Sequence, residues 1–130
     1  MNIIYRTDYN FTKDDCVELF KSVNWHSANY PDLLYEALKN YPGMFHAWDN
    51  DKLVGMVATL DDGCMNAYVH YVLVNPEYQK YNIGYKLMCM NNEKYKDYVN
   101  VVLIAYNNVV GFYEKLGYKV NKEACAMLIK

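Results

Sequence analysis

The chain has 130 residues, 53% of them hydrophobic, which suits a single domain over residues 1–130 and excludes a disordered chain. The formal net charge is -2 and no cluster of lysines and arginines stands out, so we expect no nucleic-acid partner. No stretch approaches the roughly 20 apolar residues that span a bilayer, and residues 1–7 lack the apolar run of a signal peptide. We therefore expect a cytoplasmic protein with no membrane partner.

The cysteines and histidines show no metal-binding pattern. There is no Cys-x-x-Cys pair, and no two histidines have the spacing of metal ligands on one helix. We expect reduced, mostly buried cysteines and no metal ion. The residues concerned are Cys16, Cys64, Cys89 and Cys125, and His26, His46 and His70.

The first half of the chain predicts a strand, two helices and three further strands. The opening strand is expected at 2–6, and Thr12 with Asp15 resembles a capping box at the start of the first helix. Pro31 suits the first position of the second helix, which Gly43 follows. Polar turns then separate three strands that should form an antiparallel meander, at 44–48, 53–60 and 66–74.

The second half predicts two helices that alternate with strands. A helix begins near Asn82, a buried strand covers 99–105, and a short helix over 109–116 stops at Gly117. The last strands are expected at 118–120 and 124–129. The order β-α-α-β-β-β-α-β-α-β-β predicts an α/β protein with a mixed sheet and helices on both faces.

The segment from the end of the 66–74 strand to the helix at Asn82 predicts an anion site. The first turn of a helix leaves N–H groups without internal partners, and the helix dipole favours negative charge there. Gly84 in this turn would let phosphates approach the backbone closely. A pyrophosphate is the ligand that this arrangement suits.

Two motifs in this order resemble those of the GNAT superfamily of acetyl-CoA-dependent N-acetyltransferases. Gln79 to Gly84, after Val74-Asn75-Pro76, resembles the family's Gln/Arg-x-x-Gly-x-Gly/Ala loop, with Asn82 in place of the first glycine. Asn is the non-glycine residue that best tolerates left-handed backbone angles. The stretch 112–118, Phe-Tyr-Glu-Lys-Leu-Gly-Tyr, resembles the family's second motif. The resemblance extends over essentially the whole chain.

The resemblance implies the GNAT fold, in which the fourth and fifth strands splay and acetyl-CoA enters the gap. The pantetheine arm would bond to the strand backbone and the pyrophosphate would lie on residues 79–85. A family asparagine seven residues before the motif tyrosine corresponds to Tyr106, with Asn107 beside it. Small members often form homodimers. The implied acetyl-CoA contacts are Val72, Leu73, Val74, Gln79, Lys80, Tyr81, Asn82, Ile83, Gly84, Tyr85, Tyr106 and Asn107.

The resemblance also assigns catalytic roles. Tyr113 matches the tyrosine that protonates the departing thiolate, although its spacing equally suits the apolar stripe of its helix. Some family members have a glutamate in the fifth strand, and that position is Val101 here. His70, taken as in phase with Val72 and Val74 on the fourth strand, is the first candidate for the general base, and a structural histidine is the alternative.

Trp25, His26 and Tyr30 precede the second helix, where family members shape the acceptor pocket, and core packing is the alternative role. The interpretation is an N-acetyltransferase that acts on a primary amine of a small molecule or peptide. A module that binds acyl-CoA without turnover is the alternative. Asn82, Tyr106 and the missing strand-five carboxylate favour this sensor, whereas Tyr113 favours the enzyme.

Overall fold

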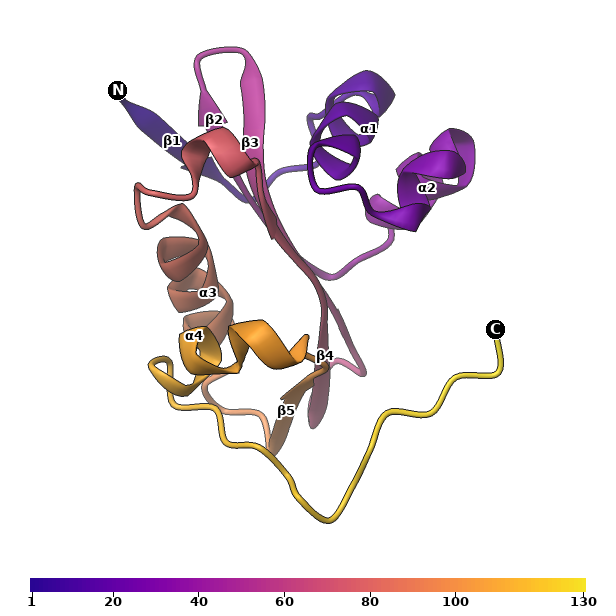
Figure 1. Cartoon of the computed structure of the whole chain (residues 1–130), viewed down its shortest axis with the longest axis vertical. Coiled ribbons are helices and arrows are strands. Elements are labelled where there is room, and N and C mark those ends of the chain that lie inside the picture. Colours follow the sequence, from indigo (N-terminus) through magenta and orange to yellow (C-terminus); the bar gives the residue numbers. More distant parts are fainter.

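A computed structural model describes all 130 residues and shows a mixed five-stranded sheet in the order β1-β2-β3-β4-β5 (Figure 1). The first four strands are antiparallel neighbours, and β5 runs parallel to β4. This arrangement confirms the predicted fold class. The strands are β1 Ile3–Arg6, β2 Gly43–Asp49, β3 Lys52–Asp61, β4 Asn66–Val74 and β5 Asn100–Leu103.

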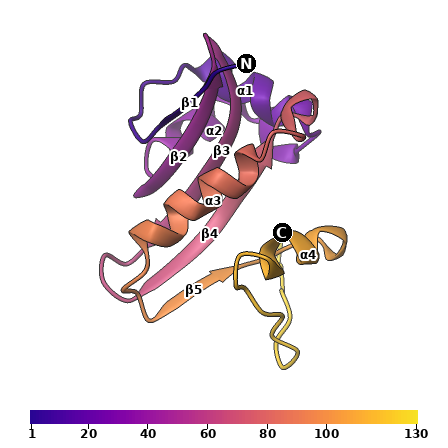
Figure 2. The same ribbon diagram turned by 90° about the vertical axis from the view of Figure 1, so that its left-hand side faces the viewer.

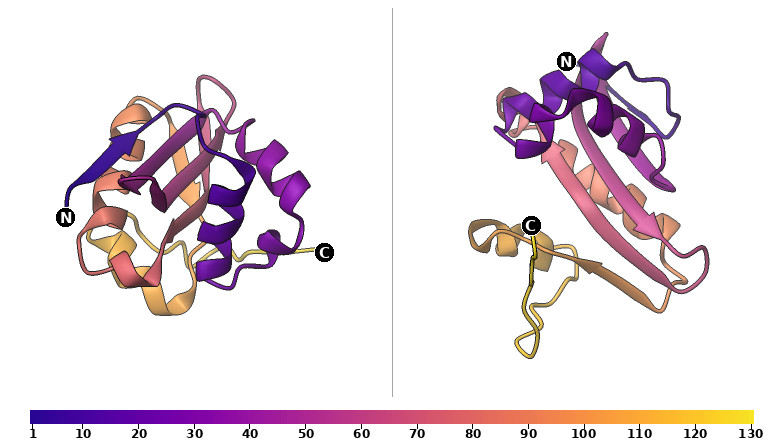
Figure 3. Two further views of the ribbon diagram at one scale, coloured as in Figure 1. Left: turned by 90° about the horizontal axis from the view of Figure 1, so that it is seen from above. Right: turned by 90° about the vertical axis from the view of Figure 1, so that its right-hand side faces the viewer.

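Helices lie on both sides of the sheet (Figure 3). On one face lie α1, Lys13–Ser22, and α2, Pro31–Leu38, and on the other lie α3, Ile83–Lys94, and α4, Val110–Glu114. Short 3-10 turns occupy His26–Asn29, Pro76–Tyr78 and Asn107–Val109. None of the helices has the length and apolar character that crossing a bilayer requires.

The helix starts follow from local chemistry as predicted. Thr12 Oγ1 accepts from the Asp15 N–H at 3.1 Å, and the Asp15 carboxylate accepts from the Thr12 N–H at 2.9 Å, so the capping box is confirmed. Pro31 occupies the first position of α2. Gly117 has φ +94° after α4, which confirms it as the stop residue.

Each face of the sheet has its own hydrophobic core. Fourteen buried residues fill the space between the sheet and α1 and α2, and eight fill the space under α3. The Thr59 hydroxyl donates to Asn91 Oδ1 at 2.6 Å, which ties β3 to α3 through a fully buried hydrogen bond. The cysteines depart from the prediction, since Cys16 is buried but the other three are exposed.

β4 and β5 diverge along their length. The pairing joins residues 66–69 of β4 to residues 100–103 of β5, whereas residues 70–74 of β4 have no partner on that side. Figure 2 shows the two strands starting side by side and separating, with α4 beyond the end of β5. The splay that the family resemblance implied is therefore present.

β4 also contains a bulge at His70. Thr59 lies opposite Val69 and Ala58 lies opposite Tyr71, so His70 is an extra residue on β4. The extra residue reverses the alternation of side chains. Val69 faces the α3 side before the bulge, and Val72 faces that side after it.

The two last predicted strands do not form. Residues 118–130 contain no strand, and residues 119–130, here called the C-terminal segment, run clear of the sheet (Figure 1). A strand requires a neighbouring edge for its backbone hydrogen bonds, and this segment has none in the structure. The helix predicted at 109–116 is also shorter, because its beginning is a 3-10 turn.

We predict that Gly43→Ala destabilises the protein. A Cβ at position 43 would overlap the Tyr95 hydroxyl and lie 2.9 Å from Thr59 Cβ, and Tyr95 is fully buried. We expect a loss of about 1–3 kcal/mol, typical of overpacking, in urea denaturation. Gly111→Ala is the control, because a Cβ there meets nothing within 4 Å and should be neutral or stabilising. Equal stability of the two variants would contradict the packing at Gly43.

Candidate functional site

The loop between β4 and α3 has the backbone geometry of an anion-binding turn. The Asn75 side chain accepts from the Glu77 N–H at 3.0 Å and starts the 3-10 turn. Asn82 precedes α3 with φ 60° and ψ 21°, in the left-handed region. This confirms the expectation that asparagine adopts the conformation that glycine would otherwise supply.

The first turn of α3 presents unpaired N–H groups. The Asn82 side chain does not cap the helix, and its carbonyl receives only the Lys86 N–H, at 3.0 Å. No backbone carbonyl accepts from the N–H groups of residues 83–85. They lie at the positive end of the helix dipole, where an anion supplies the missing acceptors.

Gly84 is the point where three separate segments meet. A Cβ at this position would lie 3.5 Å from both Val74 Cγ2 on β4 and Phe112 Cζ on α4. The end of β4, the start of α3 and the second motif are therefore neighbours. Two motifs that are about 30 residues apart in sequence form one site here.

The backbone of the β4 end faces the splay. The Asn75 N–H donates to Val54 O at 2.8 Å, so Asn75 and, by alternation, Leu73 bond to β3. The N–H and C=O groups of Val72 and Val74 then point toward the side that β5 leaves open. Three of these four backbone groups have no partner there, and the fourth, Val74 O, accepts one hydrogen bond from the loop.

That contact comes from Gln79. Its side chain donates to Val74 O at 3.1 Å and braces the loop against β4. The sequence analysis placed Gln79 beside the pyrophosphate; in the structure Gln79 is exposed, and its side chain bonds to the backbone of β4. The neighbouring motif residues are exposed at the loop surface: Lys80, Tyr81, Asn82 and Tyr85.

Tyr113 lies on α4 with a half-buried ring and a free hydroxyl. Its ring packs edge-on against Phe112 at 5.0 Å and near Tyr118 at 6.1 Å, so it does belong to the apolar stripe. The Tyr118 hydroxyl donates to Asn92 at 2.8 Å, whereas that of Tyr113 makes no hydrogen bond within the protein. Burial raises the pKa of Tyr113 and raises the pKa of Tyr118 to about 12. Both phenols are protonated at neutral pH.

The bulge places His70 among aromatic rings on the α1 and α2 side. His70 stacks on Tyr71 at 4.1 Å and on Tyr68 at 5.3 Å, and its Nδ1 lies 2.6 Å from the Tyr41 hydroxyl. His70 lies on the opposite face of the sheet from Val72 and Val74. The prediction that these three side chains share a face was therefore wrong. Alternation alone cannot reveal an inserted residue.

His70 is exposed but partly desolvated by these rings. This burial lowers the pKa of His70 below its ordinary value of 6.5, so the imidazole is neutral at pH 7. Its Nε2 has no hydrogen-bond partner in the protein. The aromatic partners Tyr41, Tyr68 and Tyr71 were not found by the sequence analysis, because 15 tyrosines give no single one a signal.

The three predicted acceptor-pocket residues do not form one group. Trp25 packs against Phe20 at 5.9 Å and Tyr71 at 6.0 Å, which joins it to the His70 rings. His26 and Tyr30 form a separate exposed pair, 5.2 Å apart. Residues 106 and 107 are exposed after β5.

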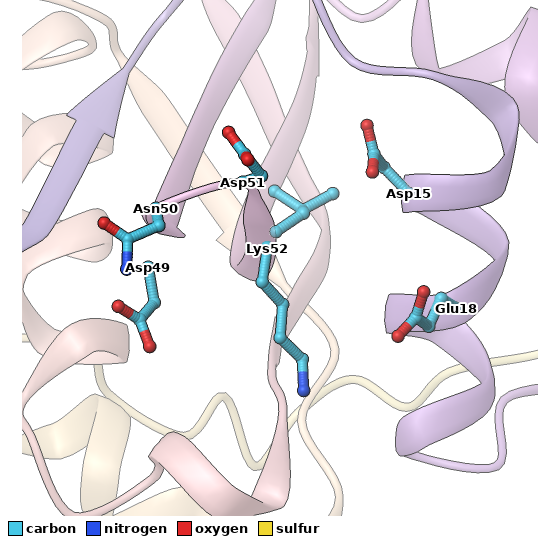
Figure 4. Close-up of a pocket in the computed structure, with 7 residues that line it drawn as sticks. Asp15, Glu18, Asp49, Asn50, Asp51 and Lys52 are labelled. Atoms are coloured by element: carbon cyan, nitrogen blue, oxygen red, sulfur yellow. The ribbon is translucent and has the colours of Figure 1, made fainter.

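An open hollow of about 400 Å³ lies between α1 and the β2–β3 turn (Figure 4). Four carboxylates and one lysine line it, together with Asn50 and Leu53. An anion such as pyrophosphate would be repelled by this net negative charge. The hollow is therefore distinct from the α3 anion site. The charged residues are Asp15, Glu18, Asp49, Asp51 and Lys52.

Comparison with known proteins supplies the family. The sequence model described as "Acetyltransferase (GNAT) domain" matches residues 10–127. The chain belongs to the GNAT acetyltransferase family. It is similar to the GCN5-related N-acetyltransferase 2, chloroplastic, of Arabidopsis thaliana, with 36% identity over 74 residues, 55% of this chain and 29% of the relative. The histone acetyltransferase TAP1 of Glycine max is 32% identical over 77 residues, 58% of this chain and 33% of the relative. The matches thus span about a third of these relatives.

Solved structures resemble the chain over nearly its whole length. A GNAT-family acetyltransferase from Streptococcus pneumoniae has 26% identity and a TM-score of 0.84, covering 99% of this chain and 97% of its own. A putative acetyltransferase from Deinococcus radiodurans has 25% identity and a TM-score of 0.83, covering 98% and 87%. A probable acetyltransferase from Staphylococcus aureus, at 23% identity and a TM-score of 0.88 with 99% of both chains covered, shares the fold.

We predict that Asn82→Ala destabilises the protein by about 1 kcal/mol, because alanine is strained at φ 60°. Asn82→Gly should be as stable as the wild type or more so, since glycine adopts this angle freely. Urea denaturation of both variants measures the difference. An Asn82→Ala protein as stable as Asn82→Gly would show that the left-handed turn is absent in solution.

Proposed function

We propose that residues 1–130 form one N-acetyltransferase domain that moves acetyl from acetyl-CoA to a primary amine of a small molecule or peptide. The observation that carries the proposal is the contact of the uncapped α3 start with the unpaired end of β4 at Gly84. An anion acceptor and a row of free backbone groups suit a ligand with a pyrophosphate and an amide-containing arm. Family membership supports acetyl transfer.

Acetyl-CoA fits these residues as follows. The pyrophosphate would take the N–H groups of residues 83–85, and the pantetheine amides would pair with Val72 and Val74 as a strand pairs with an edge. Leu73 is buried between the two and holds the strand in place. Residues 106 and 107 would flank the arm from the β5 side. The co-substrate supplies an activated acetyl group as a thioester.

The acceptor amine must be neutral to attack. Deprotonating an alkylammonium with a pKa near 10 costs about 4 kcal/mol at pH 7, so a base is required. His70 suits this role because burial lowers its pKa and keeps the ring neutral. When its Nδ1–H donates to the Tyr41 oxygen, Nε2 has a free lone pair for the proton of the amine. Tyr41 would then hold His70 in the active tautomer.

Tyr113 would protonate the departing thiolate. A phenol with a pKa near 10 gives a proton to a thiolate near 8.5 only against about 2 kcal/mol, and burial raises the pKa of Tyr113 further. Proton transfer must therefore accompany the breaking of the C–S bond. The free hydroxyl of Tyr113 supports the donor role alongside its packing role.

The proposed acceptor class rests on the aromatic residues around His70 and on the name of one relative. The aromatic rings around His70, with Trp25 beside them, suit a cationic amine that loses its proton on binding. The exposed pair His26 and Tyr30 would contact the more distant part of the acceptor. The name of the Glycine max relative, a histone acetyltransferase, supports a peptide amine.

The alternative function is an acyl-CoA sensor without turnover. The observation that favours it is Val101, whose half-buried side chain packs with the α3 core at the position where some family members have a glutamate. We propose that the protein is cytoplasmic, whether it acts as an enzyme or as a sensor. All four thiols are free and three are exposed, which suits a reducing environment.

We predict that acetyl-CoA raises the melting temperature of the wild type but not of Gly84→Val. A ligand at a hundred times its Kd adds about 2.7 kcal/mol to stability. A Cβ at Gly84 would lie in ordinary contact with Val74 and Phe112 at 3.5 Å, so the larger valine should narrow the opening beside the N–H groups of residues 83–85, and its melt without ligand checks that it folds. Thermal melts with millimolar acetyl-CoA measure both proteins. An unchanged melting temperature of the wild type would contradict both the enzyme and the sensor. An equal rise in the variant would show that the phosphates bind elsewhere.

We predict that His70→Ala lowers kcat/KM and removes the acid inflection of the pH–rate profile. Its pKa lies below 6.5, so wild-type activity should fall as the pH drops through that lower value and the base becomes protonated. His26→Ala is the control for the pH profile alone: His26 lies outside the ring group, so the variant can raise the KM of the acceptor but should keep the acid inflection. An unchanged profile in His70→Ala would assign the deprotonation to water.

We predict that Tyr113→Phe lowers kcat by roughly 10–10³-fold with nearly unchanged acetyl-CoA affinity. The ring remains, so packing with Phe112 persists and only the transition-state proton is lost. Tyr118→Phe is the control, because it loses the hydrogen bond to Asn92 and should lower stability rather than kcat. Wild-type kcat in Tyr113→Phe would show that Tyr113 is a packing residue only.

A further inference from the structure

A hydrogen bond joins the β2–β3 hairpin to the loop that leads into α3. Asp49 is the last residue of β2, and Tyr78 ends the 3-10 turn Pro76–Tyr78. The Tyr78 hydroxyl donates to the Asp49 carboxylate at 2.6 Å. This distance is typical of a hydrogen bond to a charged acceptor, which is stronger than one between neutral groups. Figure 4 shows Asp49 on the side of the hairpin turn that faces away from α1.

Asp49 is a fixed point of the sheet. It pairs with Ile3 on β1 and with Lys52 on β3, and Asn50 makes the turn with φ 52°. The bond to Asp49 raises the pKa of Tyr78, so the hydroxyl stays protonated and remains the donor. A rigid hairpin thus holds one side chain of a loop, which is how scaffolds position functional loops.

The loop has few other anchors between β4 and α3. At its start, the Asn75 N–H donates to Val54 O at 2.8 Å, on the same hairpin. The Gln79 side chain adds one hydrogen bond to β4 from the surface. Residues 79–82 are all exposed. The position of the chain just before α3 therefore depends mainly on Tyr78.

A second contact at the same place is weak. Lys52 Nζ lies 4.0 Å from the Glu77 carboxylate and 5.7 Å from the centre of the Tyr78 ring. The lysine and glutamate side chains are 42% and 79% exposed, so water screens the pair. The hydrogen bond from Tyr78 to Asp49 is therefore the main link between the hairpin and the loop.

We propose that Asp49 and Tyr78 are positioning residues for acetyl-CoA, which hold the loop so that the N–H groups of residues 83–85 meet the pyrophosphate. This inference rests on the proposed function, which assigns the pyrophosphate to those N–H groups. An anchored loop is already in the binding arrangement, whereas a free loop adopts it only part of the time. A loop in that arrangement about a tenth of the time would bind about ten times more weakly.

The test is the Kd of acetyl-CoA by isothermal titration calorimetry. Tyr78→Phe loses the hydroxyl but keeps the ring that packs against the α3 core, and Asp49→Ala loses the acceptor. We expect each to raise the Kd about tenfold, with little change in the melting temperature of the free protein. The double variant should be no weaker than the weaker single variant, because both changes break one bond. Asp49→Asn keeps an acceptor oxygen and should retain most of the affinity.

Tyr95→Phe is the matched control. The Tyr95 hydroxyl also donates to a carboxylate, that of Asp61 at 2.7 Å, but at the C-terminal end of α3. Tyr95 is fully buried, so its variant should lower the melting temperature and leave the Kd of acetyl-CoA unchanged. The pair of variants separates positioning of the loop from a general loss of stability.

Hydrogen exchange of the free protein supplies a readout that needs no acetyl-CoA. The N–H groups of Glu77 and Tyr78 donate to Asn75, and they should exchange faster in Tyr78→Phe than in the wild type. Unchanged exchange, or a wild-type Kd in Tyr78→Phe, would overturn the inference and leave the proposed function standing. So would additive losses in the double variant. A wild type that does not bind acetyl-CoA would overturn the inference and the proposed function together.

Discussion

The divergence of β4 from β5 is the constraint on which the site depends. After Val69 the backbone of β4 has a partner only on the β3 side, so polar groups of Val72 and Val74 face an opening. Unpaired backbone groups in a protein interior are costly, and water or a ligand must satisfy them. The same opening adjoins the start of α3 at Gly84, where further N–H groups are unpaired. One break in the sheet thus gathers all the free backbone groups of the site.

The bulge at His70 separates the two functions that the site would need. After it, Val72 and Val74 turn their side chains toward α3, while their backbone faces the splay. His70 itself joins the rings of Tyr41 and Tyr71 on the α1 and α2 side. A proton acceptor and a set of free backbone groups therefore lie close together on one strand without competing for the same space.

The end of the sheet poses a different physical problem. β5 is short, and one edge of it together with the C-terminal segment remain without partners although both are apolar. Hydrophobic surface of this kind is normally covered.

The sequence by itself determined the element order through Glu114, the helix starts at Thr12 and Pro31, and the left-handed turn at Asn82, because these follow from neighbouring residues. The two motifs also identified the family. Only the tertiary structure decided the face of His70, its Tyr41 partner and the bond from the Gln79 side chain to Val74. Only it showed that residues 118–130 form no strand. Register, bulges and strand pairing depend on which edges meet in space, and local sequence patterns carry no information on that.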